Sequence, residues 1–423
     1  MRQMRDSGIE WIGNIPNNWL TDKLMWHLEE VNISNNPIQT DDILSLTIEA
    51  GVIPYEDKGN QGNKAKEDVS QYKIAYPNTL VVNSMNVIIG AVGISKYYGC
   101  VSPVYYVFKA SKGTDLRYIY YIFTNVGFQK EMRKYSKGIM EIRLRISSSD
   151  MLRRVIPLPN FEEQTRIADF LDSQCAYIDN IILRTSESIE EYRNLKQAMI
   201  TQAVTKGVRG NRPMKDSGIK WIGNIPEEWD IYRISSLYEE RREQGDDSLP
   251  ILTVSINSGV SDRELSDEEN ERIFVRSEDK TKYARVYPGD LTYNMMRAWQ
   301  GAFGAVRVDG MVSPAYVIAK PKQELDSRYM EALLRTEAAK QEMKRYSYGI
   351  ADFRMRLYWG YFKCIKVCLP PIDEQKEIAD YIDEKAKEID DLINKKQIFL
   401  EELERFKKSM IYEYVTGKKE IRS

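Results

Sequence analysis

Two long segments of the chain place apolar residues at every third or fourth position, with charged residues between them. One follows Pro159 and the other follows Pro371, and each continues for about 45 residues without glycine or proline. This spacing predicts two amphipathic helices, each a rod of roughly 65 to 70 Å at about 1.5 Å per residue. An exposed apolar stripe needs a partner, and the obvious partner for each helix is the other, as an antiparallel coiled coil. The stripes comprise Ile167, Phe170, Leu171, Ile178, Ile181, Ile182, Ile189, Tyr192, Leu195 and Met199, then Ile378, Ile382, Ile389, Leu392, Leu400, Leu403, Phe406 and Met410.

Shorter apolar and aromatic runs, separated by Gly, Pro and Asn, occupy roughly 150 residues before each helix. The runs ILSLTI, TLVVNS, NVIIGAVG and VYYVF between Ile43 and Phe108 are typical of strands separated by turns. Residues 116–135 predict one or two helices. Each part is therefore expected to be a globular α/β (α+β) domain whose strand order the sequence does not predict.

The chain repeats itself along its whole length. The segment from Asp6 to Trp19 recurs from Asp216 to Trp229 with eleven of fourteen positions identical. Later blocks match at an offset of 211, including PLPNFEEQ from Pro157 and CLPPIDEQ from Cys368. Such self-similarity indicates an internal duplication. We expect domains at 1–155 and 209–366, long helices at 156–208 and 367–423, and a pseudo-twofold repeat that makes the helices antiparallel.

Composition favours a cytoplasmic protein. Hydrophobic residues make up 42% and charged residues 29% of the 423 positions, which is ordinary for a globular chain. No apolar run approaches the roughly 18 residues of a membrane helix, and the opening MRQMRDSG does not resemble a secretory signal. Four cysteines in so long a chain do not form a disulfide framework, and Cys364 and Cys368 are expected to be buried structural residues rather than zinc ligands.

Positive charge is concentrated in two equivalent windows although the net charge is −2. Residues 109–145 contain nine Lys/Arg against three Asp/Glu, and residues 320–366 contain eleven against six. Either window alone is typical of a solvated helix face. Two matched windows favour an anionic partner such as nucleic acid.

The ordered motifs resemble those of a known family. GIxWIGxIPxxW, the TIEAGV block, the basic SxGIxxxRxR segment and the PLPxxEEQxxIADFLD helix opening are similar to specificity subunits of type I restriction-modification systems. The resemblance covers the whole chain twice. It implies two target-recognition domains joined by two helices, which read a split double-stranded DNA site with a non-specific spacer. It also implies two modification subunits that methylate adenine at N6, and restriction subunits that translocate and cut DNA.

The resemblance implies that this chain performs no chemistry, so S-adenosylmethionine, ATP and Mg are expected in the partner subunits. The residues agree with this expectation. A single histidine, His27, nearly excludes histidine-based triads and His-rich metal sites. The sequence also lacks an Asn/Asp-Pro-Pro-aromatic methyltransferase motif and a phosphate-binding glycine loop.

The duplicated segments KYSKGIMEIRLRI and RYSYGIADFRMRL contain the best candidates for DNA contact. Arginines that alternate along a strand point to one face, where a guanidinium can bind a phosphate or guanine. Because both halves keep them, we expect contacts to the DNA backbone; an exposed, salt-bridged strand is the alternative. The candidates are Lys134, Lys137, Arg143, Arg145, Lys344, Arg345, Arg354 and Arg356.

Base readout is expected where the repeats diverge. NSMNV (Asn83 to Val87) stands opposite NMMRA (Asn294 to Ala298), so Arg297 corresponds to Asn86. Asparagine can pair with adenine and arginine with guanine. Asn83 and Asn294 can equally be turn residues. The loops at 54–72 and 262–282 also differ almost completely.

The repeated opening motif and the helices are expected to serve packing or subunit docking. Large aromatic side chains are suited to such contacts. The candidates are Trp11, Trp19, Trp221, Trp229, Ile167, Ile178, Ile378 and Ile389. A plain core segment is the alternative for the motif. Two other functions stay open: a non-enzymatic coiled-coil scaffold, and a stand-alone DNA-binding regulator.

Overall fold

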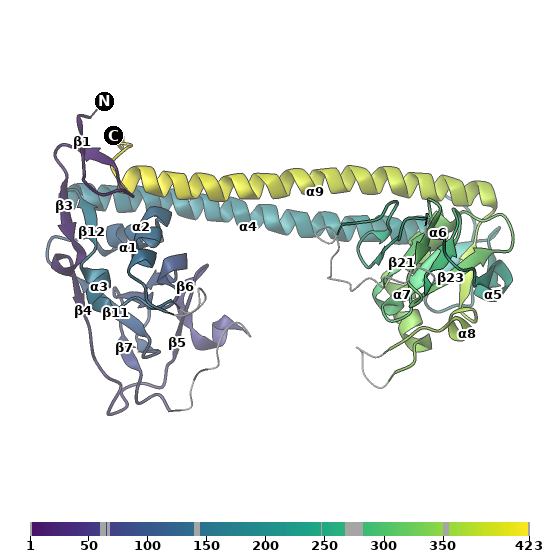
Figure 1. Ribbon diagram of the computed structural model, residues 1–423, viewed down its shortest axis with the longest axis horizontal. Helices are drawn as coiled ribbons and strands as arrows, with labels where there is room; N and C mark the ends of the chain where they lie inside the picture. Colours follow the sequence, from purple (N-terminus) through teal and green to yellow (C-terminus); the bar gives the residue numbers. More distant parts are fainter. Residues whose placement is uncertain are drawn as a thin grey trace. The chain divides into compact units, whose positions relative to one another are not determined.

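The computed structural model describes residues 2–59, 65, 68–138, 144–246, 248–266, 282–349 and 355–421 (Figure 1). The chain divides into two compact units. Unit 1 comprises Met1–Ser186 and Gln397–Ser423, and unit 2 comprises Glu187–Lys396. Each unit therefore combines a globular part with a piece of both long helices.

The two predicted long helices are present as α4 (Phe161–Lys206, 46 residues) and α9 (Ile372–Val415, 44 residues). Figure 1 shows them as uninterrupted ribbons. A glycine with left-handed backbone follows the C-terminal end of each helix: Gly207 after α4 has φ 76°, and Gly417 after α9 has φ 70°. Only glycine adopts this conformation without strain, which explains why the repeat ends VTKG in one half and VTGK in the other.

Within each unit, α4 and α9 run antiparallel and are joined by equivalent ion pairs. In unit 1, Lys407 Nζ of α9 lies 2.6 Å from Asp179 of α4. In unit 2, Lys196 Nζ of α4 lies 2.6 Å from Asp390 of α9. Asp390 is the counterpart of Asp179 and Lys407 that of Lys196, each 211 positions apart. The two ion pairs are therefore equivalent, with the acidic and basic partners exchanged between the helices. The coiled-coil pairing is therefore built on the internal repeat.

The predicted apolar stripes are only partly buried. Ile167, Ile178 and Ile378 are buried, and Ile389 is half-buried. The prediction is wrong for other members of the stripes, because Leu195, Leu392 and Phe406 are 55%, 41% and 55% exposed. A pair of helices has a narrow contact seam, whereas apolar residues at every third and fourth position cover a wider face.

The globular part of unit 1 is built on an antiparallel sheet with strand order β4-β11-β8-β9. Side chains of successive residues point to opposite faces of a strand. Accordingly, Leu80 and Val82 join a core that includes α1 and α2, whereas Val81 joins a smaller cluster on the other face. The elements are β1 Met4–Asp6, β2 Asn14–Pro16, β3 Leu20–Lys23, η1 Leu24–Trp26, β4 Leu28–Glu30, β5 Leu44–Thr47, β6 Gly51–Pro54, η2 Tyr55–Lys58, β7 Lys73–Ala75, β8 Leu80–Asn83, η3 Val87–Ile89, β9 Val92–Ile94, β10 Gly99–Val101, β11 Tyr105–Ala110, α1 Leu116–Thr124, α2 Val126–Lys134, α3 Ser148–Leu152 and β12 Val155–Leu158.

The globular part of unit 2 repeats this arrangement with strand order β16-β23-β20-β21. Leu291 and Tyr293 join its main core, and Ile318 joins the smaller cluster. The elements are β13 Met214–Asp216, β14 Asn224–Pro226, β15 Asp230–Arg233, α5 Ile234–Leu237, β16 Tyr238–Arg241, β17 Val254–Ser255, β18 Gly259–Val260, β19 Ala284–Val286, β20 Leu291–Asn294, η6 Ala298–Gln300, β21 Phe303–Ala305, β22 Gly310–Val312, β23 Tyr316–Pro321, α6 Ser327–Leu334, α7 Glu337–Tyr346, α8 Trp359–Phe362 and β24 Lys366–Leu369. The mixed helix and strand composition expected for both globular parts is confirmed.

Local expectations differ in their outcome. Residues 116–135 contain two helices, because the extended backbone of Asn125 ends α1. Its side chain accepts a hydrogen bond from Gly127 N–H at the start of α2. The prediction of a strand throughout NVIIGAVG is wrong. Val87–Ile89 is a 3₁₀ turn that ends at Gly90, with φ 90°, and the strand begins only at Val92. In the part of the chain that the structure describes, no helix has the length and apolarity needed to cross a membrane.

Candidate nucleic-acid interface

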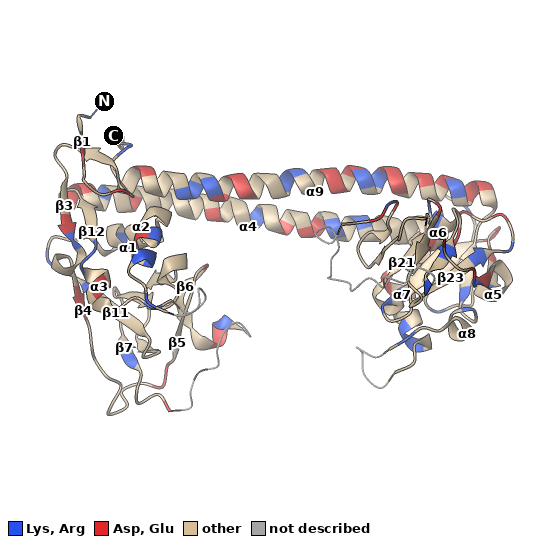
Figure 2. Ribbon diagram, in the orientation of Figure 1, with Lys and Arg blue, Asp and Glu red and all other residues tan. Residues whose placement is uncertain are grey.

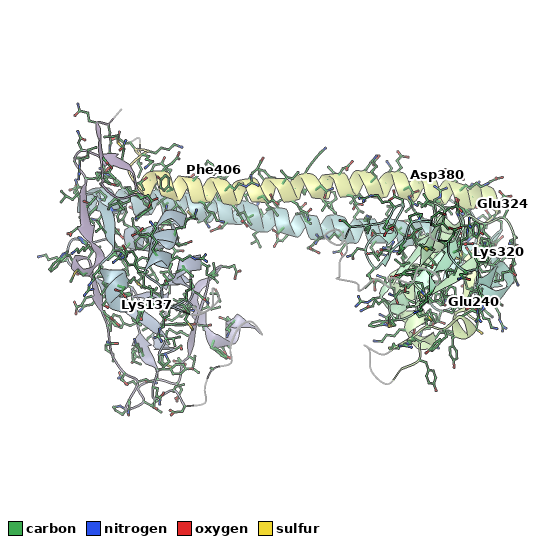
Figure 3. All side chains as sticks on the ribbon, viewed as in Figure 1. Lys137, Glu240, Lys320, Glu324, Asp380 and Phe406 are labelled. Carbon is green, nitrogen blue, oxygen red and sulfur yellow. The ribbon has the colours of Figure 1, made fainter. Side chains whose placement is uncertain are left out.

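The duplicated basic segments form the base of a hairpin in each unit. In unit 1, Lys137 and Arg145 exchange both backbone hydrogen bonds, at 2.8 and 2.9 Å. In unit 2, Tyr348 and Arg356 do the same, at 2.9 and 3.0 Å. The side chains of Lys137, Arg145 and Arg356 are exposed, and Lys137 is labelled in Figure 3. The remaining alternating arginines, Arg143 and Arg354, lie outside the described residues.

Each hairpin is attached to the turn where the repeats diverge. The backbone N–H of Ile146 donates to the Ser84 carbonyl at 3.1 Å, and the N–H of Leu357 donates to the Met295 carbonyl at 2.9 Å. Ser84 and Met295 are themselves divergent, and they stand two positions before Asn86 and Arg297. The two groups of candidates, predicted separately, are therefore brought together into one site per unit.

Asn83 and Asn294 have the same structural role at the start of these turns. The side-chain oxygen of Asn83 accepts a hydrogen bond from Met85 N–H at 3.0 Å, and that of Asn294 accepts one from Met296 N–H at 3.0 Å. Both asparagines are buried. Their geometry matches the turn alternative. The next divergent residues are more accessible, since Asn86 is exposed and Arg297 is half-buried.

Asn86 lies at the edge of a cavity of about 520 Å³ in unit 1. Hydroxyl, amide and aromatic groups line this cavity, and burial raises the pKa of Tyr105 within it. Such groups can hydrogen-bond to base edges and stack on bases. The lining includes Thr47, Tyr55, Tyr72, Asn83, Asn86 and Tyr105. The more distal parts of the divergent loops, 60–64, 66–67 and 267–281, lie outside the described residues.

The other basic candidates have partners inside the chain. Lys134 Nζ lies 2.8 Å from Glu10 and 3.0 Å from Glu131, and hydrogen bonds to these carboxylates raise its pKa. Arg345 pairs with Glu342 at 2.7 Å. Lys344 Nζ lies 5.1 Å from the ring centroid of Trp299. Exposed pairs of this kind are weak, so an anionic partner can compete for these cations.

The long helices are acidic, in contrast to the hairpins. The α4 sequence has eight Asp/Glu and five Lys/Arg, and α9 has thirteen and eight. Figure 2 shows the two signs interleaved along both helices. A negatively charged helix surface repels phosphates. The globular parts, and not the helices, are therefore suited to bind a polyanion.

The repeated tryptophans pack within their own unit. Trp11 packs against Phe128 of α2, with ring centroids 5.5 Å apart and the ring planes tilted by 59°. Trp19 and Pro16 approach Gly417 so closely that a Cβ there would lie 2.5 Å from Pro16. In unit 2, Trp229 is fully buried and its indole N–H donates to Glu374 at 3.1 Å. The opening motif thus attaches each globular part to the end of a long helix.

A buried ion pair at each attachment was missed by the sequence reasoning. Arg2 lies 2.5 Å from Glu163 in unit 1, and Arg212 pairs with Glu374 in unit 2. The two glutamates begin α4 and α9, and both are buried. The available signal was the repeat itself, because Arg2 and Arg212 each stand four residues before the aspartate that opens the repeated motif. The acidic helix openings therefore make contacts within their own units.

A pair of equivalent cavities flanks these attachments. One, of about 1010 Å³, lies in unit 1, and the other, of about 940 Å³, lies in unit 2. Arg2, Met4, Asn14 and Phe170 line the first, and the equivalent residues Arg212, Met214, Asn224 and Tyr381 line the second. The exposed Leu195 lines the second cavity as well. Each unit thus presents the same groove beside its long helices.

The structure offers no metal site among the residues it describes, since no group of three or more His, Cys, Asp and Glu is placed to hold an ion. The single histidine has structural partners: His27 Nδ1 lies 3.0 Å from Thr114 Oγ1, and Nε2 lies 3.2 Å from Asp22. Cys368 is buried as expected, but the expectation is wrong for Cys364, which is exposed. Cys364 lies in the turn after α8, between the exposed Lys363 and the buried Ile365.

Comparison with known proteins bears on the fold and the family. Residues 28–191 match the type I restriction modification DNA specificity domain family. The type I restriction enzyme MjaVIII specificity subunit of Methanocaldococcus jannaschii is 26% identical over 293 residues, which are 63% of this chain and 63% of that relative. The aligned region thus covers less than two thirds of the relative's length.

Solved structures show the same fold over nearly the whole chain. A structure of a type I R-M system, reported for its complex assembly and conformational transition, covers 96% of this chain and 99% of its own, with TM-score 0.68 and 15% identity. The HsdS subunit from Thermoanaerobacter tengcongensis covers 96% and 98%, with TM-score 0.53 and 16% identity. The resemblance predicted from the motifs is confirmed.

Proposed function

We propose that this chain, which is similar to type I restriction-modification specificity subunits, is the DNA-reading subunit of such a system. Each unit reads one part of a bipartite double-stranded site, and the chain itself carries out no chemistry. The proposed recognition domains are residues 1–155 and 209–366. The helical segments 156–208 and 367–423 connect them and set the spacer.

The observation that carries the proposal is the duplicated site of turn and hairpin. Each unit joins an exposed basic hairpin base to a turn whose side chains differ between the repeats. A feature kept in both repeats suits contacts to phosphates, which are the same in every sequence, whereas a divergent feature suits contacts to bases. The two sites have the same backbone arrangement but different side chains in the turn. This combination favours recognition of two different short sequences.

The backbone-contacting set in this proposal consists of the basic residues on and beside the hairpins. Lys137, Arg145 and Arg356 are its exposed members on the hairpin bases. Burial lowers the pKa of nearby Lys73, and the like charge of Arg145 lowers it further. Clustered positive charge that repels itself is stabilised by a polyanion. The set comprises Lys134, Lys137, Arg143, Arg145, Lys344, Arg345, Arg354 and Arg356.

Two modification subunits bind beside the long helices in this proposal. The two equivalent grooves, and the exposed apolar residues Leu195 and Phe406 at positions 211 apart, offer the same surface twice. Two copies of one partner match a surface that is presented twice. Restriction subunits join the same complex, and S-adenosylmethionine, ATP and Mg act in these partners, within the cytoplasm.

Methylation mapping tests the proposal. N6-methyladenine is mapped across the host genome with this gene intact and with it deleted. We expect deletion to remove methylation from one two-part motif with a fixed gap. An unchanged map together with duplex binding indicates a stand-alone regulator. An unchanged map without salt-dependent duplex binding indicates a scaffold, because phosphate contacts weaken steeply with salt.

A matched pair of double variants tests the phosphate contacts. Lys137→Ala with Arg145→Ala removes two charges from the hairpin base, and Arg184→Ala with Lys408→Ala removes two exposed charges from the helices. We expect only the first variant to weaken binding to all duplexes and to reduce the salt slope by about 2, one for each lost contact. Equal effects of both variants would contradict the assignment.

A further inference from the structure

The divergent turn has the same backbone in both units. Asn86 N–H donates to the Asn83 carbonyl at 3.2 Å, and Arg297 N–H donates to the Asn294 carbonyl at 3.0 Å. The carbonyl of Asn86 accepts from Ala91 N–H at 3.1 Å, and that of Arg297 accepts from Ala302 N–H at 3.2 Å. These backbone hydrogen bonds of one turn therefore have their counterparts in the other.

The backbone angles agree as closely as the hydrogen bonds. Asn86 has φ −113° and ψ 5°, and Arg297 has φ −130° and ψ 8°. The 3₁₀ turns that follow end at Gly90 and Gly301, with φ 90° and 95°. Asn86 and Arg297 thus stand at one position of one scaffold, and each residue tolerates the backbone of the other.

The two side chains are available to an external partner. Asn86 is exposed and lines the cavity of unit 1 together with Tyr105. Arg297 is half-buried, and its positive charge acts on Tyr316, the equivalent of Tyr105: burial raises the pKa of Tyr316 and Arg297 lowers it. Within the described residues the Arg297 guanidinium forms no ion pair, whereas Arg117, Arg212, Arg241 and Arg328 all do.

The two side chains present different patterns of hydrogen-bond donors and acceptors, and these patterns match different bases. An asparagine amide can donate to N7 of adenine through its nitrogen and accept from the N6 amino group through its oxygen. An arginine guanidinium offers two parallel donors, which match O6 and N7 of guanine. The hairpin attached to each turn holds the DNA backbone nearby in the proposed function.

We infer that position 86 in unit 1 and position 297 in unit 2 are equivalent specificity positions, at which Asn86 reads adenine and Arg297 reads guanine. This inference rests on the proposed function and adds one base identity to each half-site. It also makes the two positions exchangeable. The residue at this position selects the base, and the scaffold does not.

The test is a selection from a duplex library by the purified complex of the full chain with its modification subunits. The library has two randomised blocks separated by spacers of different length. The variants are Asn86→Arg, Arg297→Asn, and the truncations Asn86→Ala and Arg297→Ala. We expect Asn86→Arg to change one base pair of one half-site from A·T to G·C, and Arg297→Asn to make the reverse change in the other half-site.

The expected preference for the new base over the old one is roughly 5- to 150-fold, the range for a bidentate base contact. The alanine variants should lose discrimination at the same base pair and keep the remainder of the motif. They keep the inference testable if an exchange variant fails to fold. Thermal unfolding of each variant identifies such a failure.

The outcomes separate this inference from the proposed function. If the wild-type complex selects no bipartite sequence, the proposed function fails and the inference fails with it. If the wild type selects a bipartite site and the exchange and alanine variants select that site unchanged, only the inference is overturned. A change in both half-sites from one substitution overturns it too.

Discussion

The indole N–H of Trp229 donates a hydrogen bond to the carboxylate of Glu374 at 3.1 Å, and neither side chain is exposed to solvent. The same carboxylate pairs with Arg212, which precedes β13 in the sequence. Glu374 lies in the first turn of α9. One buried carboxylate therefore links the opening motif of unit 2 to the long helix, through two residues that the repeat preserves.

Removal of Arg212 should destabilise unit 2 strongly. Arg212→Ala removes the nearer cation of the buried Glu374 carboxylate and leaves only the half-exposed Arg209, 3.9 Å away. Breaking a buried pair costs about 3–5 kcal/mol. Urea unfolding followed by tryptophan fluorescence measures the loss. Arg242→Ala is the matched control in the same unit, because Arg242 is 80% exposed and pairs with Glu240 at 2.8 Å. Equal stability of the two variants would show that the buried pair does not hold the attachment.

Two buried tyrosines should contribute equally to the two units. The hydroxyl oxygen of Tyr118 lies within hydrogen-bond distance of two backbone carbonyls, 2.9 Å from that of Pro157 and 3.0 Å from that of Val415. Tyr329 makes the equivalent contacts to Cys368 and Val204, both at 3.1 Å. Replacement by phenylalanine leaves buried carbonyls with fewer donors, so each variant should lose about 1–3 kcal/mol of unfolding free energy.

The control for the tyrosine variants is Tyr177→Phe, because Tyr177 is 63% exposed on α4. Chemical denaturation of the full chain measures all three variants. A loss in Tyr118→Phe without a matching loss in Tyr329→Phe would mean that the two attachments are not energetically equivalent.

The sequence predicts the repeat, the helices and the strands because these leave periodic traces. The limits of α4 and α9 follow from apolar spacing and from flanking proline and glycine. The buried pair of Arg212 and Glu374 could not be derived from spacing, because the two residues are 162 positions apart and meet only when the chain folds. Likewise, burial of Leu195 was expected from its spacing, but its exposure depends on which face the partner helix covers.

In the candidate site, too, some features were predictable from the sequence and others were not. Asn86 and Arg297 were found by comparing the repeats, because a divergent position inside a conserved frame is visible in the sequence. The hydrogen bonds that attach each hairpin to its turn were not predicted, since they join backbone atoms of Ile146 and Ser84 that lie far apart in the chain. Backbone pairing of this kind leaves no pattern in residue type.

Thiol labelling should distinguish one cysteine from the other three. Burial raises the pKa of Cys100, Cys175 and Cys368 to about 11, so very little of each is thiolate at pH 8. The thiolate is the reactive form, and Cys364 alone among the four is exposed. We expect one thiol to react rapidly with a disulfide reagent in the native protein and four after denaturation. Cys364→Ser should abolish the rapid phase, and its persistence would contradict the assignment.

The Asp115 ion pair predicts a pH dependence of stability. Burial raises the pKa of Asp115, but the hydrogen bonds from Arg117 and its charge lower the pKa by more. The pKa of Asp115 in the folded state therefore lies below its ordinary value. A carboxyl with a depressed pKa stabilises the folded state above its unfolded pKa of about 3.9, and this contribution is lost as the pH falls through the folded value.

Comparison of the wild type with Asp115→Asn measures this contribution. The difference in unfolding free energy should be constant between about pH 5 and 7 and should shrink below about pH 4, where the wild-type carboxylate becomes protonated. Asp230→Asn is the control, since Asp230 is exposed. A difference that grows towards acid pH would have the wrong sign and would exclude a lowered pKa.

If modification subunits bind beside the long helices as proposed, Leu195 and Phe406 should govern how many of them bind. They occupy equivalent positions of α4 and α9, and each is 55% exposed (Figure 3 labels Phe406). Their neighbours in the stripe are half-buried or buried. Leu195→Glu and Phe406→Glu place a charge on this surface without burying it, so the folded chain should keep its stability. Each single variant should retain one modification subunit, and the double variant none, as read from native mass spectrometry. Trp26→Glu is the control, because Trp26 is 62% exposed but lies in the globular part of unit 1. Two bound subunits in the double variant would place docking on another face of the helices.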